Sequence, residues 1–105
     1  MALLDALRYD SVVIVSWADG EAEKIFHRQR SRRLPPDIQQ TARRKLVMID
    51  AATRLDDLRV PPANRLEKLT GNLAGLWSIR INEQWRVCFV WSAGNASEVA
   101  IRDYH

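Results

Sequence analysis

The spacing of apolar residues changes near the middle of this chain, and that change decides its fold class. In the first half the apolar positions recur at helical intervals, and in the second half they alternate with polar positions, as in strands with one buried face. Between the halves, residues 56–62 hold two adjacent aspartates and two adjacent prolines, which break the helical pattern. Helices followed by a sheet predict an α+β fold, and a length of 105 residues predicts one domain.

The first half predicts one strand and two helices. Residues 12–17 are mostly β-branched and predict a strand, and Asp19 is a favourable N-cap for a helix that should end near residues 30–31. A second helix should begin within residues 34–37, since proline is tolerated in a first helical turn. The expected buried face of the first helix is Ala22, Ile25, Phe26 and Gln29. That of the second is Ile38, Ala42, Leu46, Ile49 and Thr53.

The second half predicts a four-stranded antiparallel sheet. Its strands should lie at residues 66–69, 77–82, 86–91 and 98–102, which gives the overall order β-α-α-β-β-β-β. The apolar faces of the middle two strands match only if an odd number of residues connects them, and a three-residue connection at 83–85 satisfies this condition.

One face of the predicted sheet gathers arginines. Alternation places Arg80, Arg86 and Arg102 on the same side, opposite the apolar face. Both helices should cover the apolar face, so we expect the arginine face to be open. This face is the candidate site.

Charge is spread unevenly along the chain, although the net charge is only +3. Arginine outnumbers lysine thirteen to three, and the planar guanidinium suits paired contacts with phosphate. Within residues 24–45 there is a single acid, Asp37. The bases of that segment are Lys24, Arg28, Arg30, Arg32, Arg33, Arg43, Arg44 and Lys45. The pattern is compatible with a polyanionic partner and equally with solvated helix faces.

Other features narrow the function class. The one cysteine, Cys88, lies in an apolar run, which is typical of a small buried hydrophobe and leaves no disulfide framework. The sequence shows neither an apolar stretch long enough to span a bilayer nor a signal peptide, so a cytoplasmic protein is expected. The acids are scattered, there is no histidine cluster, and no nucleotide-binding motif is present, so no metal or other cofactor is expected.

Two segments carry a resemblance to a known family. Residues 71–89 read GNLAGLWSIRINEQWRVCF, in which GLWSIRINEQWR is the most specific part, and the chain ends on Asp103, Tyr104 and His105. With the helical segment KLVMIDAATRLDDL at residues 45–58, they resemble the HigB-type toxins of the RelE superfamily over residues 12–105. The resemblance implies a small RelE-like fold with an N-terminal strand, two helices and a curved antiparallel sheet. Residues 1–11 would then be an extension: an expression remnant, a misassigned start or a real arm.

The resemblance also implies an activity and partners. It implies the toxin of a type II toxin–antitoxin system, an mRNA interferase that enters the A site of the small ribosomal subunit and cleaves messenger RNA there. The implied partner is a HigA-type antitoxin with a helix-turn-helix domain, which neutralises the toxin and represses the operon. Contact with DNA would be indirect, through that complex.

The family's functional residues can be carried over by position. The transition-state arginine falls on Arg86, and a polar residue that holds the nucleotide in some relatives falls on Gln84. The terminal acid, aromatic and histidine are Asp103, Tyr104 and His105. Some members have a lysine where this chain has Thr70, and we expect Lys68, on the same side of that strand, as its substitute. The expected RNA-binding residues are Gln84, Lys68, Thr70, Arg80, Arg102, Arg28, Arg30, Arg32, Arg33, Arg43, Arg44 and Lys45.

These residues fit metal-free RNA cleavage by the neighbouring 2′-hydroxyl. That reaction needs a base, charge stabilisation on the phosphorane and an acid for the leaving 5′-oxygen. Arg86 would donate paired, charge-assisted hydrogen bonds to the phosphate. His105 would be the general acid, because imidazole titrates in the right range, with Asp103 as the base or as the group that orients the imidazole. Tyr104 would stack on a splayed base or bond the phosphate.

Two other function classes stay open. One is a non-catalytic basic module that binds RNA or the antitoxin, which Thr70 in place of lysine favours. The other is a DNA-binding regulator, which is less favoured because the chain shows no helix-turn-helix of its own. The arginine-rich segments would contact ribosomal RNA or an acidic antitoxin surface.

Overall fold

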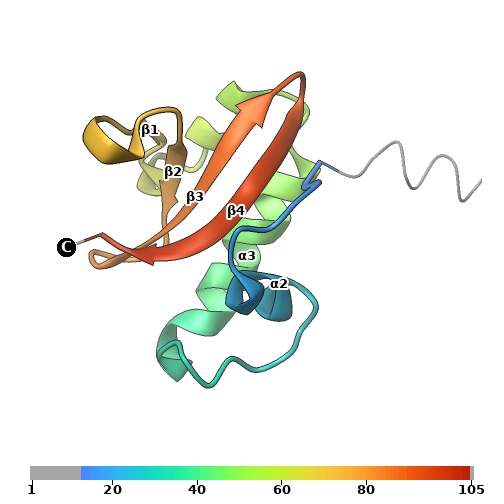
Figure 1. Cartoon of the computed structure of the whole chain (residues 1–105), viewed down its shortest axis with the longest axis vertical. Helices are drawn as coiled ribbons and strands as arrows, with labels where there is room; N and C mark the ends of the chain where they lie inside the picture. Colours follow the sequence, from blue (N-terminus) through green and yellow to red (C-terminus); the bar gives the residue numbers. More distant parts are fainter. Residues whose placement is uncertain (1–12, 105) are drawn as a thin grey trace, which may run out of the picture.

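The computed structural model describes residues 13–104, so the expected extension at residues 1–11 and His105 lie outside the described residues. Two α-helices lie on one side of a four-stranded antiparallel sheet of order β1-β2-β3-β4 (Figure 1). The predicted α+β class, the two helices and the four consecutive strands are confirmed. The strands are β1 (Glu67–Lys68), β2 (Trp77–Arg80), β3 (Trp85–Ser92) and β4 (Asn95–Asp103). Three short 3₁₀ helices lie between α3 and β2: η1 (Leu55–Arg59), η2 (Pro62–Asn64) and η3 (Gly71–Leu73).

The segment predicted as the first strand is extended but joins the sheet only by isolated bridges. Ile14 and Trp17 form parallel bridges to Ala96 and Val99 of β4. Between these bridges Glu98 adopts φ 51°, and its N–H bonds the Ser16 hydroxyl oxygen at 2.9 Å instead of a backbone carbonyl. The regular ladder is therefore interrupted, and the segment lies along β4 without being a full strand.

The first helix, α2 (Gly20–Phe26), begins where predicted and ends earlier. The Asp19 carboxylate accepts a hydrogen bond from the N–H of Glu21 at 2.8 Å, as expected of an N-cap. The predicted end near residues 30–31 is wrong, because Arg28 adopts a left-handed conformation with φ 64° directly after the His27 cap. Gln29 is consequently exposed and outside the helix, contrary to prediction, whereas Ala22 and Ile25 are buried.

The second helix, α3 (Pro36–Ala51), carries the core-facing stripe that its spacing predicts. Its four buried residues are Ile38, Ala42, Leu46 and Ile49. Thr53, predicted as the end of this stripe, is exposed, because the chain leaves the helix at the Ala52 C-cap. Four residues at helical spacing thus suffice to orient α3 against the sheet.

The β2–β3 hairpin has the predicted faces but a different register. A connection at residues 83–85 would place Arg86 opposite Asn82, whereas Arg86 pairs with Arg80. The turn begins one residue earlier because the Asn82 side-chain oxygen accepts from the N–H groups of Gln84 and Trp85, each at 2.8 Å. The change of two residues preserves the parity, so the apolar and arginine faces stay as expected.

The last strand is longer than predicted because it contains a bulge. We expected it to begin at Glu98, but β4 begins at Asn95. The pairing shifts between Cys88 and Val90 of β3, and Glu98 is the extra residue in the left-handed region. Ala96 and Val99 consequently both enter the core although they are three positions apart. The alternation used for prediction fails at such a bulge.

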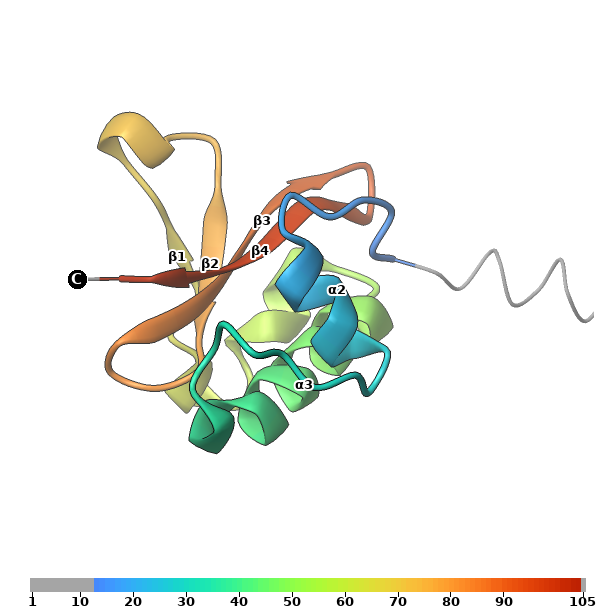
Figure 2. The same cartoon turned by 60° about the horizontal axis from the view of Figure 1, so that its bottom comes forward.

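The core lies between the helices and one face of the sheet. It joins α3 residues such as Leu46 to Ile79 of β2, Val87 and Phe89 of β3 and Ile101 of β4, all buried. Figure 2 shows both helices on the same side of β3 and β4, which curve over them. Among residues 13–104, no helix combines the length and the apolar character that crossing a membrane requires.

Candidate functional site

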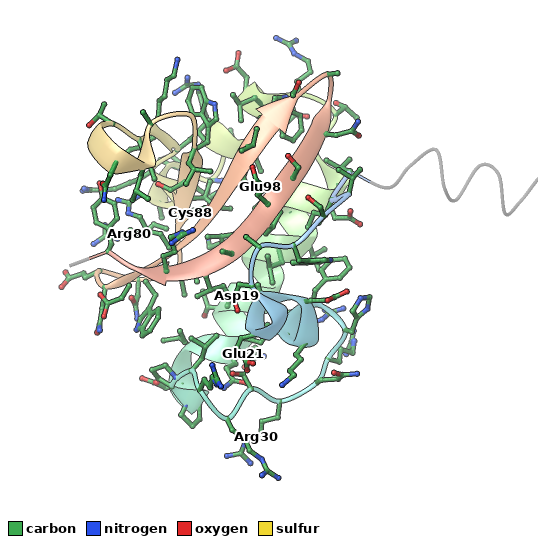
Figure 3. All side chains as sticks on the ribbon, viewed as in Figure 1. Asp19, Glu21, Arg30, Arg80, Cys88 and Glu98 are labelled. Carbon is green, nitrogen blue, oxygen red and sulfur yellow. The ribbon has the colours of Figure 1, made fainter. Side chains whose placement is uncertain are left out.

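Three arginines from adjacent strands share the face opposite the core. Arg86 of β3 pairs with Arg80 of β2 on one side and with Arg102 of β4 on the other. The predicted arginine row is therefore confirmed. Like charges placed directly opposite each other are unfavourable, so this row favours an anion at its surface. Figure 3 shows Arg80 and Cys88 labelled near one another on the sheet, far from Arg30 at the lower end of the molecule.

Arg86 itself is buried, at 6% exposure, so the expectation of an open face is wrong at its centre. The guanidinium is surrounded by groups from β1 and β2, from the residue that precedes Leu66, and from the C-terminal end of the described chain. Its Nη1 donates to the Ser78 hydroxyl oxygen at 3.0 Å and to the Arg65 carbonyl at 3.4 Å, and its Nη2 donates to the Glu67 carboxylate at 3.1 Å. The Tyr104 ring centroid lies 4.3 Å from the guanidinium carbon, which is a cation–π contact.

Three apolar residues outside the core are buried as well. Leu69, Cys88 and Ala100 are buried but lie outside the main core cluster. Burial raises the pKa of the Cys88 thiol, with smaller opposing effects from Arg102 and Arg86. The expectation that Cys88 behaves as a small buried hydrophobe is confirmed, and the thiol stays protonated at neutral pH.

The C-terminus is tied to the hairpin turn. The Gln84 side-chain amide donates to the Asp103 carboxylate at 2.9 Å, and the N–H of Tyr104 donates to the Gln84 carbonyl at 2.7 Å. Gln84 in turn is held by the Asn82 turn described above. The structure therefore brings together Gln84, Asp103, Tyr104 and Arg86, all from the predicted set.

Consecutive residues at the end of β4 point to opposite faces of the sheet. Asp103 pairs with Trp85, while Arg102 pairs with Arg86. Asp103 thus occupies the strand position beside the arginine row rather than within it. The carboxylate that forms an ion pair with Arg86 is Glu67.

Sequence reasoning missed Glu67, although a signal for it exists. In the β1–β2 pairing, Glu67 lies opposite Ser78, whereas Lys68 lies opposite Trp77, with its ammonium 6.0 Å from the Trp77 ring centroid. Lys68 therefore faces away from Arg86 and does not take the place of the lysine that some relatives carry. Ser78 lies on the same face of β2 as Arg80, and Glu67 lies opposite Ser78. The alternation of β2 would therefore have predicted Glu67 on the arginine face if the β1–β2 register had been known.

Thr70 is three residues after Glu67 in the sequence, but its side chain makes none of the contacts given for Arg86. It is exposed and precedes η3 as its N-cap residue, without a side-chain capping bond. Arg80, half-buried, donates through Nε to the Asn82 carbonyl at 3.1 Å, and Arg102 is exposed. Arg80 and Arg102 therefore flank Arg86 on the two sides of the arginine face.

The arginines near the two helices form a second group, away from Arg86. They include Arg32 and Arg33, which are exposed in the turn between α2 and α3. A hollow of about 390 Å³ lies between the end of α2 and the first half of α3. Its lining residues are Ile25, Arg28, Gln29, Arg30, Gln39, Gln40, Arg43 and Arg44.

Lys45 does not belong to that group, contrary to expectation. Its ammonium donates to the Asn64 side-chain oxygen at 2.6 Å, and Asn64 is fully buried. Burial, and secondarily the charge of Arg44, lowers the pKa of Lys45. We assign Lys45 to holding the η2 segment against α3.

The described part of the chain, residues 13–104, contains no group of three or more metal-ligating side chains. The fold and the site together define a class of protein: a small α+β domain with a buried, carboxylate-paired arginine at the end of a curved sheet. Residues 15–105 match the HigB-like toxin family, described as RelE-like toxin of type II toxin-antitoxin system HigB. This chain belongs to that family, and the resemblance seen in its sequence is confirmed.

Individual relatives agree with this assignment. The chain is 48% identical over 68 residues to Toxin HigB-1 of Vibrio cholerae serotype O1, covering 65% of this chain and 72% of that protein. It is 34% identical over 61 residues to Endoribonuclease HigB of Proteus vulgaris, covering 58% of this chain and 65% of that protein. Among solved structures, it is similar to the YoeB-YefM complex from Staphylococcus aureus, with a TM-score of 0.52 and 19% identity over 90% of this chain and 97% of that one. The structural likeness concerns the fold alone.

Proposed function

We propose that this protein is a ribosome-dependent endoribonuclease that cleaves messenger RNA in the A site and thereby stops translation. The observation that carries the proposal is the guanidinium of Arg86, which neighbouring groups hold in one orientation. A positioned cation that does not need to reorganise is what a phosphorane transition state requires. Membership of the HigB-like toxin family and a relative named an endoribonuclease support the reaction class.

Glu67 and Arg86 suggest how the first chemical step proceeds. The carboxylate now on Nη2 of Arg86 occupies the place that a phosphate oxygen would take. When a phosphate displaces it, Glu67 stays beside the reacting group and accepts the proton of the 2′-hydroxyl. The 2′-oxygen then bonds to phosphorus, while Arg86 stabilises the charge on the non-bridging oxygens.

The C-terminus supplies the second step. We assign His105 as the acid that protonates the leaving 5′-oxygen, which completes a 2′,3′-cyclic phosphate and a new 5′-hydroxyl end. Asp103, held by Gln84 at 2.9 Å, orients the imidazole. Tyr104 keeps its ring on Arg86 and supplies a stacking surface for a base. No step in this scheme uses a metal ion.

The closed arrangement around Arg86 gives a reason for ribosome dependence. RNA must displace the Glu67 carboxylate and pass Tyr104 before its phosphate reaches the guanidinium. A messenger strand held in the decoding site has already lost most of its conformational freedom, so it reaches Arg86 at a lower entropy cost than unstructured RNA does. The protein would accordingly act in the cytoplasm, on translating ribosomes.

The partners follow from the family. We propose a HigA-type antitoxin with a helix-turn-helix domain that neutralises this protein, and contact with operator DNA only through that complex. The structural neighbour is itself a complex of YoeB with YefM.

A reconstituted translation reaction tests the function. The 5′ ends of a translated message would be mapped for the wild type, for Arg86→Ala, and for a variant lacking His105. We expect new ends at the decoding site with the wild type, and a loss of at least about 100-fold in their rate of appearance for Arg86→Ala. Arg59→Ala is the matched control, because Arg59 is an exposed arginine that pairs with Asp56 and makes none of the contacts given for Arg86.

The cleavage rates can be compared only if every variant is folded. Circular dichroism and antitoxin binding should be unchanged in all of them. If folded wild-type protein produced no cuts on translating ribosomes, the endonuclease proposal would be abandoned for the non-catalytic module that binds RNA or the antitoxin.

A further inference from the structure

The two terminal nitrogens of the Arg86 guanidinium have partners of different kinds. Nη2 donates to the carboxylate of Glu67, a side chain that is 42% exposed. Nη1 donates to the Ser78 hydroxyl oxygen and to the Arg65 carbonyl, and Ser78 is fully buried. An incoming phosphate repels a carboxylate but not a neutral hydroxyl. The partner of Nη2 can therefore be displaced, whereas the partners of Nη1 stay.

The sheet fixes the position of Ser78 from both sides. Ser78 pairs with Glu67 of β1 and with Cys88 of β3, and Cys88, labelled in Figure 3, is itself 1% exposed. Arg86 lies opposite Arg80, two residues after Ser78, so Ser78 holds the diagonal position that a long side chain can reach. A side chain packed between two paired strands has little room to move, so its oxygen is a fixed acceptor for Arg86.

Of the two acceptors on Nη1, Ser78 accepts the shorter hydrogen bond. The distance from Nη1 to the Ser78 oxygen is 3.0 Å, within the usual range for an N–H donor and an oxygen. The distance from Nη1 to the Arg65 carbonyl oxygen is 3.4 Å, which is longer than that range. The hydroxyl therefore contributes more to the orientation of the guanidinium than the carbonyl does.

Arg86 needs a fixed partner because its neighbours in the sheet repel it. Arg80 and Arg102 lie opposite it on the two adjacent strands, and like charges in such positions are unfavourable. In the proposed reaction a phosphate replaces Glu67 on Nη2, so the ion pair of the protein alone cannot orient the guanidinium at that moment. The hydrogen bond to Ser78 persists through this exchange.

The contact with Tyr104 does not replace this hydrogen bond. The ring centroid is 4.3 Å from the guanidinium carbon, and a cation above a ring is attracted through the whole ring face. Such a contact restrains the position of the guanidinium without selecting the direction of its N–H bonds. A hydrogen bond does select that direction, since it weakens steeply as the N–H···O angle departs from linearity.

We infer that Ser78 is a positioning residue for the proposed cleavage: its hydroxyl holds Nη1 of Arg86 so that Nη2 faces the scissile phosphate. The inference rests on the proposed function for the reaction, but the orientation of the guanidinium can be measured without it. Ser78 is buried and acts through Arg86. Its loss should therefore lower the rate of the chemical step and leave most of the affinity for RNA.

Single-turnover cleavage on translating ribosomes, with the full chain, separates rate from affinity. Ser78→Ala should lower the maximal rate by about 10- to 100-fold, because a displaced catalytic group costs about this much. The protein concentration that gives half the maximal rate should change by less than about threefold. Cys88→Ala is the matched control, because it removes one buried polar atom from the paired position and leaves every hydrogen bond of Arg86 in place.

A second pair of variants separates hydrogen bonding from packing. Ser78→Thr and Ser78→Val place side chains of nearly equal shape in the same buried position, and only threonine keeps a hydroxyl. We expect the threonine variant to cleave at least about tenfold faster than the valine variant, the ratio that one hydrogen bond to a charged group represents. Equal rates in these two folded variants, or equal losses in Ser78→Ala and Cys88→Ala, overturn the inference. If neither bulkier variant folds, the two alanine variants decide.

The hold on the guanidinium can be measured by NMR in the protein alone. Rotation about the Cζ–Nη1 bond exchanges the two hydrogens of Nη1, and a hydrogen bond to Ser78 slows this exchange. The Arg86 signals are assigned by their loss in Arg86→Lys. Exchange at Nη1 should be about tenfold or more faster in Ser78→Ala than in the wild type, and unchanged in Cys88→Ala. An unchanged exchange rate in Ser78→Ala overturns the inference.

The two measurements distinguish this inference from the proposed function. A wild type that never cuts a message, with faster exchange only in Ser78→Ala, would remove the nuclease and keep the orientation of Arg86 by Ser78. A wild type that cuts, with Ser78→Ala as fast as Cys88→Ala, would keep the nuclease and remove the positioning role of Ser78.

Discussion

The burial of one guanidinium governs the chemistry available to this protein. The contacts of Arg86 come from different parts of the fold: Arg65 from the segment before β1, Glu67 from β1, Ser78 from β2, and Tyr104 from the residue after β4. Arginine keeps its charge at any physiological pH, so a buried arginine must have an anion or strong acceptors beside it. Glu67 fills that role in the protein alone, and RNA phosphate would fill it during reaction.

Glu67→Gln separates the two roles of this carboxylate. If Glu67 is the base, cleavage on ribosomes should fall by about 10²- to 10⁴-fold, because the amide cannot accept the proton. Affinity for a 2′-O-methylated single strand should not fall, since a negative charge facing the incoming phosphate has been removed. Both quantities would be measured on the same preparations, by single-turnover cleavage and by anisotropy. Faster cleavage in the variant would mean that Glu67 only blocks Arg86.

At the level of elements, turns and bulges decide which side chains meet. The hydrogen bonds of Ser31 fix the α2–α3 turn, and those of Asn82 set the β2–β3 register. The bulge at Glu98 shifts the pairing of β4 by one residue, and β4 stays paired with β3 on both sides of it. None of the three residues Ser31, Asn82 and Glu98 is a proline or a glycine. Their conformations depend on side-chain hydrogen bonds and on neighbouring strands.

The turn network predicts a pH dependence of stability. The hydrogen bond from Ser31, and secondarily Lys24, lowers the pKa of Glu21 below its ordinary value. A carboxyl whose folded-state pKa is depressed stabilises the fold above its unfolded pKa, and this contribution is lost as pH falls through the folded value. Between about pH 5 and about pH 3, the melting temperature of the wild type should therefore fall more steeply than that of Glu21→Gln.

The comparison is a series of thermal melts at each pH. Glu23→Gln is the matched control, because it removes the same charge from the same turn of α2 and leaves the Ser31–Glu21 hydrogen bond in place, so the steep fall of the wild type should remain. Parallel curves for the wild type and Glu21→Gln would contradict the assigned Ser31–Glu21 contact.

At the scale of the whole molecule, one core connects the helices to the sheet. Leu46 lies in the middle of the α3 stripe and is fully buried against a cluster that includes Val87 and Phe89 of β3. The arginine face is thus held in place from behind by the apolar face. Loss of the core would disturb the site without touching any of its residues.

Leu46→Ala measures this support. Removing a buried leucine side chain should lower the free energy of unfolding by about 2–5 kcal/mol, because the transfer free energy of the removed groups is lost and the cavity left behind adds a further cost. Val47→Ala, at a neighbouring position that is 40% exposed, should change it by less than about 1 kcal/mol. Urea denaturation of both variants gives the comparison. A small effect at Leu46 would mean that α3 is less important to the core than its burial indicates.

The sequence by itself determined the features that depend on local periodicity. It specified the order of helices and strands, the buried stripe of α3 and the row formed by Arg80, Arg86 and Arg102, because alternation and helical spacing are written residue by residue. The resemblance to HigB-type toxins, also a property of the sequence, identified the family and named Arg86 and the C-terminal residues as candidates.

Only the tertiary structure decided what surrounds Arg86. Its ion pair with Glu67 spans nineteen positions and its contact with Tyr104 joins a different strand end, so no local pattern contains either. The early end of α2 at Arg28 and the bulge at Glu98 likewise depend on left-handed conformations that these residue types seldom adopt. Long-range contacts in the fold stabilise these conformations. Local sequence patterns therefore predict neither the closed site around Arg86 nor the arginine-lined hollow.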